Sequence, residues 1–235
     1  MTRFADGSRL RIFAPLALLV AAIAVVGFWP TYFGTLLSGA AGAPLIIHVH
    51  AAVFVLWLVL FIAQAVLAAT GHISLHRRIG NWIMAYAVVL VGVALITAYL
   101  AFQERVAAGN FAEAARRLFA PVRDMICFVP FLAAGWIYRR KPETHKRVML
   151  TATTILLVAA VSRMFFLGKP VPMAQLLLVW ASPIYLAMLW DGFTRRLVHP
   201  VYVIGIAVMV TMRLAIPLRD TTAWLTLCEW LVRTG

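Results

Sequence analysis

The sequence is poor in charged residues, and above all in acidic ones. Only 12% of its 235 residues are charged, and eight Asp and Glu stand against 21 Lys and Arg. Ordinary soluble domains have about 25% charged and about 45–50% apolar residues, whereas this chain is 64% hydrophobic. A water-soluble core cannot bury so much apolar surface, and disordered chains lack it. The composition therefore excludes both classes and indicates that the apolar residues face lipid.

Cysteine is scarce as well. The chain has two cysteines, Cys127 and Cys228, which cannot build a disulfide framework and form no Cys-x-x-Cys pair for thiol exchange or iron–sulfur ligation. The short motifs of serine hydrolases, zinc peptidases and phosphate-binding loops are missing too. Any chemistry is therefore expected within a helical bundle or at its faces.

Long apolar runs take the place of these motifs. A helix needs about 20 apolar residues to cross the hydrocarbon layer, and no run alternates with the period of two that a transmembrane barrel requires. The predicted fold class is an all-α integral membrane bundle of about seven transmembrane helices, with Pro121 near the first turn of the fourth. The runs are Ile12–Phe28, Pro44–Ala69, Trp82–Phe102, Met125–Ile137, Val148–Leu167, Met173–Trp190 and Val201–Leu218.

The basic residues gather on one side of these runs. With the N-terminus in the cytoplasm, the inner segments hold twelve cations against three acids, and the outer segments hold seven against five. This excess follows the positive-inside rule. It predicts a bacterial inner-membrane protein with its N-terminus inside and its C-terminus outside, whose net charge of +13 needs no nucleic-acid partner. The inner cations are Arg3, Arg9, Arg11, Arg77, Arg78, Arg139, Arg140, Lys141, Lys146, Arg147, Arg195 and Arg196.

Three histidines recur at one place in successive two-helix units. His76, His145 and His199 open the third, fifth and seventh runs, each after an inner hairpin, and the residues after His76 and His145 match best. We expect parallel repeats in a single transmembrane domain. It comprises residues 1–235, with a helix at 12–28, repeats at 44–102, 121–167 and 173–218, and a C-terminal interfacial helix at 221–232.

Two smaller features are also expected. Pro130 and Pro183 lie inside apolar runs, where proline removes a backbone hydrogen bond, so both are expected to kink their helices. Residues 111–118 are expected to form a short amphipathic helix of their own outside the membrane.

The inner histidines form the first candidate site. Histidine is the commonest metal ligand and an axial ligand of haem. His76, His145 and His199 could therefore hold a metal together if the repeats pack around an axis, and His72 adds a further ligand for an inner haem. The alternative is that each histidine lies at a helix start for structural reasons, beside arginines that bind lipid phosphate.

A second candidate site lies toward the outer leaflet. His48 and His50 fall in the first turns of the second run, Arg163 and Arg213 lie near the outer ends of the fifth and seventh, and Asp124 is at similar depth. An arginine inside a span is costly unless it is paired or faces a polar cavity. Its planar fork suits a carboxylate or phosphate, such as a haem propionate, a lipid headgroup or a small acid. Alternatively, both arginines reach the outer headgroups directly.

Two stretches carry a resemblance to known proteins. His48 to Gly80, with Gln64 and the closing Leu-His-Arg-Arg-Ile-Gly, resembles a family of uncharacterised bacterial polytopic membrane proteins. So does Thr144-His-Lys-Arg-Val-Met-Leu-Thr151 followed by Arg163, which is also similar to the helix start of small membrane proteins linked to cytochrome oxidase assembly. The resemblance covers about a third of the chain. It implies a bacterial inner membrane and points to respiratory haem or copper.

Together these observations predict a protein that binds haem b or a transition metal in a respiratory or redox setting. Two alternatives stay open: a non-enzymatic binder or transporter of an anionic lipid or small organic acid, and an accessory or assembly subunit of a membrane complex. The expected partners are membrane lipids and a respiratory complex or a second copy of the chain. The cofactor ligands are expected among His48, His50, His76, His145, Arg163 and Arg213, and the metal ligands among His76, His145 and His199.

Overall fold

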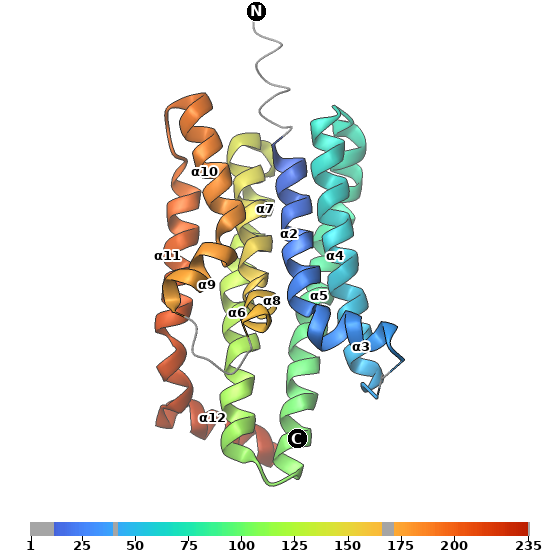
Figure 1. Cartoon of the computed structure of the whole chain (residues 1–235), viewed down its shortest axis with the longest axis vertical. Helices are drawn as coiled ribbons and strands as arrows, with labels where there is room; N and C mark the ends of the chain where they lie inside the picture. The colour runs from blue at the N-terminus through green and yellow to red at the C-terminus, as the bar shows by residue number, and fades with distance from the viewer. Residues whose placement is uncertain (1–11, 40–41, 166–171, 235) are drawn as a thin grey trace, which may run out of the picture.

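A computed structural model describes residues 12–39, 42–165 and 172–234, and every regular element in these ranges is helical (Figure 1). This confirms the all-α fold class. Arg3, Arg9 and Arg11, and the end of the fifth run at 166–167, lie outside the described residues. The elements are α2 (Phe13–Phe28), η1 (Trp29–Phe33), α3 (Gly34–Leu37), α4 (Leu45–Ala69), α5 (Ile73–Ala107), α6 (Phe111–Ile137), η2 (Tyr138–Arg140), α7 (Pro142–Leu156), α8 (Val158–Met164), α9 (Met173–Trp180), α10 (Ser182–Arg195), α11 (Pro200–Leu214), η3 (Ile216–Asp220) and α12 (Thr222–Thr234).

Length and apolar composition allow five of the described helical stretches to cross a membrane. They contain α2, α4, α5, α6 and α11. Two further stretches qualify only as bent pairs: α7 and α8 meet at 44°, and α9 and α10 meet at 65°. The described chain therefore has between five and seven potential spans, which makes it a multi-pass membrane protein.

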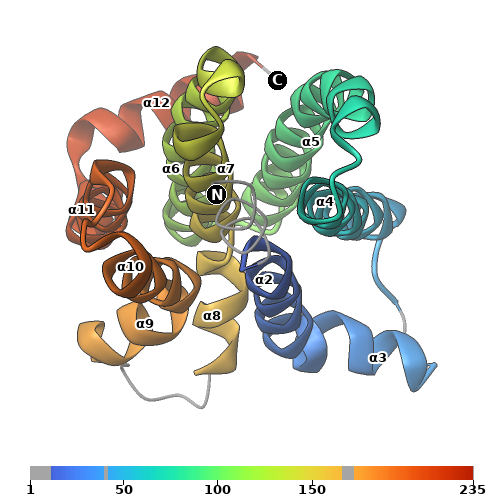
Figure 2. The ribbon, with the colours of Figure 1, turned by 90° about the horizontal axis from the view of Figure 1, so that it is seen from above.

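Helix α7 lies inside the bundle. It contacts α2, α6, α8, α10 and α11, and Figure 2 shows helices on several sides of it. Most of its residues from Arg147 to Ile155 are buried as a result. The helix carries polar threonines in this buried stretch, whereas the peripheral helix α4 has one buried residue, Trp57, and turns apolar side chains outward. That outward apolar surface is what a lipid-facing helix needs.

The two bends have identifiable causes. The α9–α10 break falls at Ala181, two residues before Pro183, whose ring removes a backbone donor and crowds the preceding turn. The kink expected at Pro183 is therefore confirmed. At the α7–α8 break the indole Nε1 of Trp180 donates a hydrogen bond to the backbone oxygen of Thr154, at 2.8 Å. The same carbonyl accepts from the backbone N–H of Leu157, at 3.0 Å, so the indole is its second donor at the point where the regular helical pattern stops.

Residues 111–118 are helical as expected, but they form the first turns of α6 and not a short helix outside it. Helix α6 begins at Phe111 and continues through Pro121 and Pro130 to Ile137. The early turns are held by packing, because Ala115 and Leu118 are buried in a small cluster with Cys228 of α12. The indole of Trp224 in α12 also donates to the Ala115 carbonyl, at 2.9 Å. The predicted C-terminal helix is thus present as α12, with one face packed on the bundle.

Three helix-to-helix hairpins lie at one end of the bundle. They join α4 to α5, α6 to α7 and α10 to α11, and Figure 1 shows all three at the same end as the start of α2. The α5–α6 connection and α12 lie at the opposite end. The first end therefore collects the residues at the starts of α5, α7 and α11, where the three recurring histidines are found.

Candidate functional site

His76 and His145 meet at the hairpin end of the bundle. Each is the fourth residue of its helix, in α5 and α7. Their ring centroids are 6.3 Å apart, and the ring planes are nearly perpendicular, at 84°. The structure therefore brings together two of the residues proposed from the sequence, and they come from the α4–α5 and α6–α7 hairpins.

The two rings are held in the same way. Nδ1 of His76 lies 3.2 Å from the backbone oxygen of Gln64 in α4, and Nδ1 of His145 lies 2.8 Å from the backbone oxygen of Gly135 in α6. A carbonyl only accepts, so each Nδ1 must carry the proton and donate it. In the neutral ring this leaves Nε2 with its lone pair, the form in which histidine binds a metal.

His199 is used differently from the other two. It is the N-cap of α11, where its Nδ1 accepts a hydrogen bond from the backbone N–H of Val201, at 3.3 Å. Within residues 12–39, 42–165 and 172–234, no group of three or more His, Cys, Asp or Glu side chains is arranged to hold a metal ion. The described chain thus offers a histidine pair, and His199 does not join it as a third ligand.

A buried amide lies beside this pair. Both side-chain polar atoms of Gln64 are buried and have no hydrogen-bond partner within the described residues. Its Oε1 lies 3.7 Å from the position that a Cβ on Gly80 would take, one turn along α5 from His76. A buried amide without a partner costs about 1–3 kcal/mol. Gln64 therefore offers a polar group to whatever binds near the histidines.

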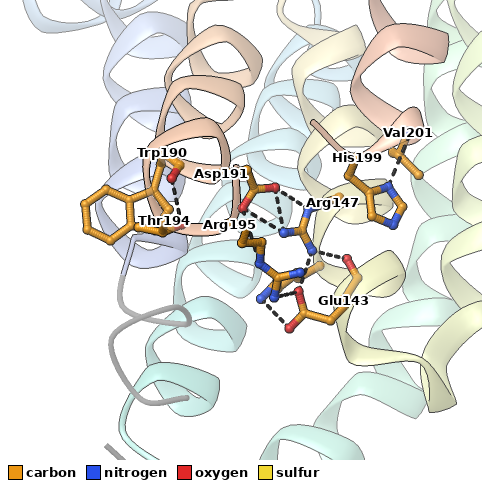
Figure 3. Close-up of polar contacts among 9 residues, drawn as sticks. Glu143, Arg147, Trp190, Asp191, Thr194, Arg195, His199 and Val201 are labelled. Carbon is orange, nitrogen blue, oxygen red and sulfur yellow. Dashed lines mark hydrogen bonds and ion pairs between the residues drawn. The ribbon is translucent and has the colours of Figure 1, made fainter. Parts of the chain in front are cut away.

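A charged network lies next to the pair in α7 and α10. The guanidinium of Arg147, 0% exposed, is clamped by Asp191, with Nε 2.7 Å from Oδ2 and Nη2 2.8 Å from Oδ1. Nη1 of Arg147 lies 2.8 Å from Oε2 of Glu143. Arg195 contacts the same Glu143 carboxylate (Figure 3). Lys146 lies 2.9 Å from Oε1 of Glu143. Three cations thus share two carboxylates, which leaves the network positive.

In the sequence these residues stand out only as charges of the inner segments. Their spacing holds a signal that could have identified them: Glu143 and Arg147 are four residues apart, and so are Asp191 and Arg195. On a helix, residues four apart are neighbours, so each helix carries its own acid–base pair. That the two pairs interlock follows only from the packing of α10 against α7.

Hydrogen bonds do not join the outer residues into one site in the described structure, although Arg163 lies close enough to His50 for its charge to act on the ring. His48 contacts the hydroxyl of Tyr32 through Nδ1, at 3.1 Å, and the ring of His50 stacks on Phe54, at 4.5 Å. Arg163 donates to the Ala159 carbonyl, at 2.5 Å. None of the hydrogen bonds or ion pairs of residues 12–39, 42–165 and 172–234 joins Arg163, Arg213 and the two histidines.

Asp124 and Arg163 each have other partners. Asp124 accepts from its neighbour Arg123, with Nη2 2.7 Å from Oδ1, and Arg123 also donates to the Met212 carbonyl, at 3.0 Å. Arg163 lies over the ring of Phe28 in α2, at 4.7 Å. Aromatic and backbone contacts of this kind accommodate an arginine near a helix end without a ligand.

No protein-family model, curated protein or solved structure matches this chain.

Proposed function

We propose that this protein is a multi-pass inner-membrane protein that holds a haem iron or another transition-metal centre between His76 and His145, in a respiratory or redox setting. The observation that carries the proposal is the 6.3 Å separation of the two rings, each fixed through Nδ1 by a carbonyl of the preceding helix. Contact with lipid at a helix start would not require the two rings to lie together or to be held in this way.

The separation fits ligation of one metal. Two imidazoles that bind one ion from opposite sides through nitrogen, at about 2.0–2.1 Å each, have ring centres about 6 Å apart. The Nδ1–H to carbonyl bonds are the usual support of a metal-bound histidine, because they fix the tautomer and the ring orientation. A helix-capping histidine needs neither feature, as His199 illustrates.

Ligand number favours haem over a bare ion. Haem iron needs only axial ligands from the protein, so a histidine pair is sufficient. A lone zinc or copper ion usually takes three or four protein ligands, and the described residues offer no such group. Arg77 and Arg78 follow His76 and are exposed, and guanidinium groups suit the carboxylates of a haem.

The membrane topology belongs to the same proposal. Seven spans, with the bent pairs α7–α8 and α9–α10 counted as one each, put the three hairpins on one side. That side carries most of the basic residues described, so the positive-inside rule favours the cytoplasm for it. The equivalent positions of His76 and His145 support the parallel repeats for the first two units. The histidine pair would then lie near the cytoplasmic surface.

The test is the cofactor content of the purified protein. The chain is produced with an ample haem supply and purified in detergent, and its absorption spectrum is measured together with its iron, copper and zinc content. A haem spectrum at about one haem per chain supports the proposal, and a stoichiometric metal without haem supports its bare-ion form. A preparation that holds neither refutes it.

Three variants locate the cofactor. His76→Ala and His145→Ala each remove one of the proposed ligands and should abolish the low-spin spectrum or the bound metal. His72→Ala is the matched control, because His72 lies at the start of the same helix, is exposed and bonds to Thr70 instead. Unchanged spectra in the first two variants would refute the ligand assignment.

A further inference from the structure

An open pocket of about 580 Å³ lies at the hairpin between α10 and α11, apart from the histidine pair. The basic side chains of Arg147 and Arg195 border it together with His199, and Figure 3 shows these three close to one another. Asp191 is the acid that lines it, and Asp191 is already clamped by Arg147. The pocket therefore presents a positive lining at the start of helix α11.

Two hydrogen-bond donors on this lining are available. Because Nδ1 of His199 accepts from Val201, the ring proton must lie on Nε2, which can donate. Arg195 uses Nη2 on Glu143 and approaches Asp191 through Nε, at 3.8 Å. The closest approaches of Arg195 to these two carboxylates thus use Nη2 and Nε, and Nη1 is the remaining nitrogen of its guanidinium. A guanidinium and an imidazole N–H that border the same pocket suit a phosphate oxygen.

An apolar groove continues from the pocket. It has a volume of about 320 Å³ and is lined by Met188, Leu189, Gly192, Phe193 and Val198. Val198 lines both spaces, so a polar head and an apolar chain could belong to one molecule. Phe193 is 85% exposed, which is unfavourable in water but normal beside lipid.

From this arrangement we infer that the α10–α11 pocket binds an anionic phospholipid, with its phosphate on Arg195 and His199 and an acyl chain along Leu189 and Phe193. Charge complementarity selects an anion, because Lys146, Arg147 and Arg195 outnumber Glu143 and Asp191. The adjoining groove favours an amphiphile over a free phosphate, because its apolar lining can contact an acyl chain. The residues that line the pocket belong to the α10–α11 hairpin and its neighbour α7. This hairpin lies at the hairpin end of the bundle (Figure 1), where headgroups meet a spanning bundle.

The test counts the lipids that stay bound. The full chain is reconstituted in nanodiscs of phosphatidylcholine with a minor share of phosphatidylglycerol, then released into the gas phase for native mass spectrometry. Wild type should retain phosphatidylglycerol in preference to phosphatidylcholine. Arg195→Gln should weaken that retention by about tenfold, which corresponds to the loss of one charge-assisted hydrogen bond.

Matched variants separate this site from general charge. Arg196→Gln removes an adjacent cation that does not line the pocket and should leave retention unchanged. Phe193→Ser alters an exposed side chain, so it should fold normally while it weakens retention of the lipid. His199→Asn keeps a cap acceptor and should weaken retention too, which covers the case in which Arg195→Gln fails to fold.

Three results would overturn the inference. One is equal loss in Arg196→Gln and Arg195→Gln, which would indicate a diffuse charge effect. Another is equal retention of the two lipids by wild type. The third is displacement of bound phosphatidylglycerol by inorganic phosphate with Phe193→Ser unaffected, because the pocket would then be a site for a free anion. The haem content of the same samples is measured separately. A negative result for lipid binding therefore does not bear on the proposal for the histidine pair.

Discussion

Arg147 of α7 and Asp191 of α10 form a two-pronged ion pair in the interior of the bundle, with nitrogen–oxygen distances of 2.7 and 2.8 Å. Asp191 is 3% exposed and Arg147 is not exposed at all. Such a pair adds little stability compared with apolar residues, but loss of Asp191 leaves the buried guanidinium of Arg147 with Glu143 alone, whose carboxylate Lys146 and Arg195 also contact. The pair therefore fixes the position of α10 against α7.

Asp191→Ala should destabilise the protein by about 3–5 kcal/mol, because Arg147 would keep its charge in the interior. The free energy of unfolding in mixed detergent and SDS micelles measures this. Arg78→Ala is the control, since Arg78 lies two residues after His76 as Arg147 lies two residues after His145, but Arg78 is exposed. This variant should cost less than about 0.5 kcal/mol. Equal effects of the two variants would contradict a special role for the pair.

The double variant Arg147→Met, Asp191→Leu should recover most of the stability lost in Asp191→Ala. Apolar residues of similar size can replace a buried ion pair at little cost. The same unfolding measurement applies. A double variant as unstable as the single one would mean that the network holds the bundle by more than charge pairing, for example through Glu143 and Arg195.

Gly27→Ala should loosen the contact between α2 and α8. A Cβ at Gly27 would lie 2.8 Å from the Cα of Ala160 and closer still to its carbonyl, and backbone atoms cannot move aside as a flexible side chain can. Overpacking of this kind costs about 1–3 kcal/mol. Gly92→Ala, with nothing within 4 Å of the added atom, should be neutral or slightly stabilising. Thermal unfolding of both variants tests the comparison.

The cap at His199 should make stability depend on pH. Burial, and then the positive charge of Arg147, hold the pKa of His199 below its ordinary value. Glu143 and Asp191 oppose this shift, and Arg195 adds to it. As the pH falls, His199 therefore binds a proton at a higher pH in the unfolded chain than in the folded one. The contribution of neutral His199 to the stability of the fold is lost as the pH falls below about 6.5.

His199→Asn isolates this contribution, because asparagine can cap a helix without titrating. The difference in unfolding temperature between wild type and variant should change between pH 7.5 and pH 5.5, with wild type losing more. A difference that is constant over this range would show that His199 does not titrate as described.

The fold could be predicted from the sequence to the extent that hydropathy determines it. Long apolar runs predicted the helices, and Pro183 predicted the bend at Ala181. The extension of α6 back to Phe111 could not be foreseen, because it depends on Trp224 and Cys228, more than a hundred residues away. The α7–α8 bend likewise coincides with a tertiary contact, the Trp180 indole on the Thr154 carbonyl.

The candidate site was foreseen in part. The repeated position of His76 and His145 implied that they could meet, and they do. His199 also follows a helix hairpin, but Pro200 begins its helix directly after it, which makes the histidine a cap. The partnership of Arg147 with Asp191 depends on which helices become neighbours, and a single sequence does not determine that.

The central claim is that His76 and His145 ligate one metal centre together, and haem titration with imidazole rescue tests it most directly. Protein purified without haem is titrated with haemin in detergent, and the absorption spectrum is recorded for wild type, His76→Ala and His145→Ala. We predict one haem per chain with a low-spin, two-histidine spectrum in wild type. Each variant should lose that spectrum and regain it when free imidazole is added. Wild-type protein that binds no haemin, or variants with the wild-type spectrum before imidazole is added, would contradict the account.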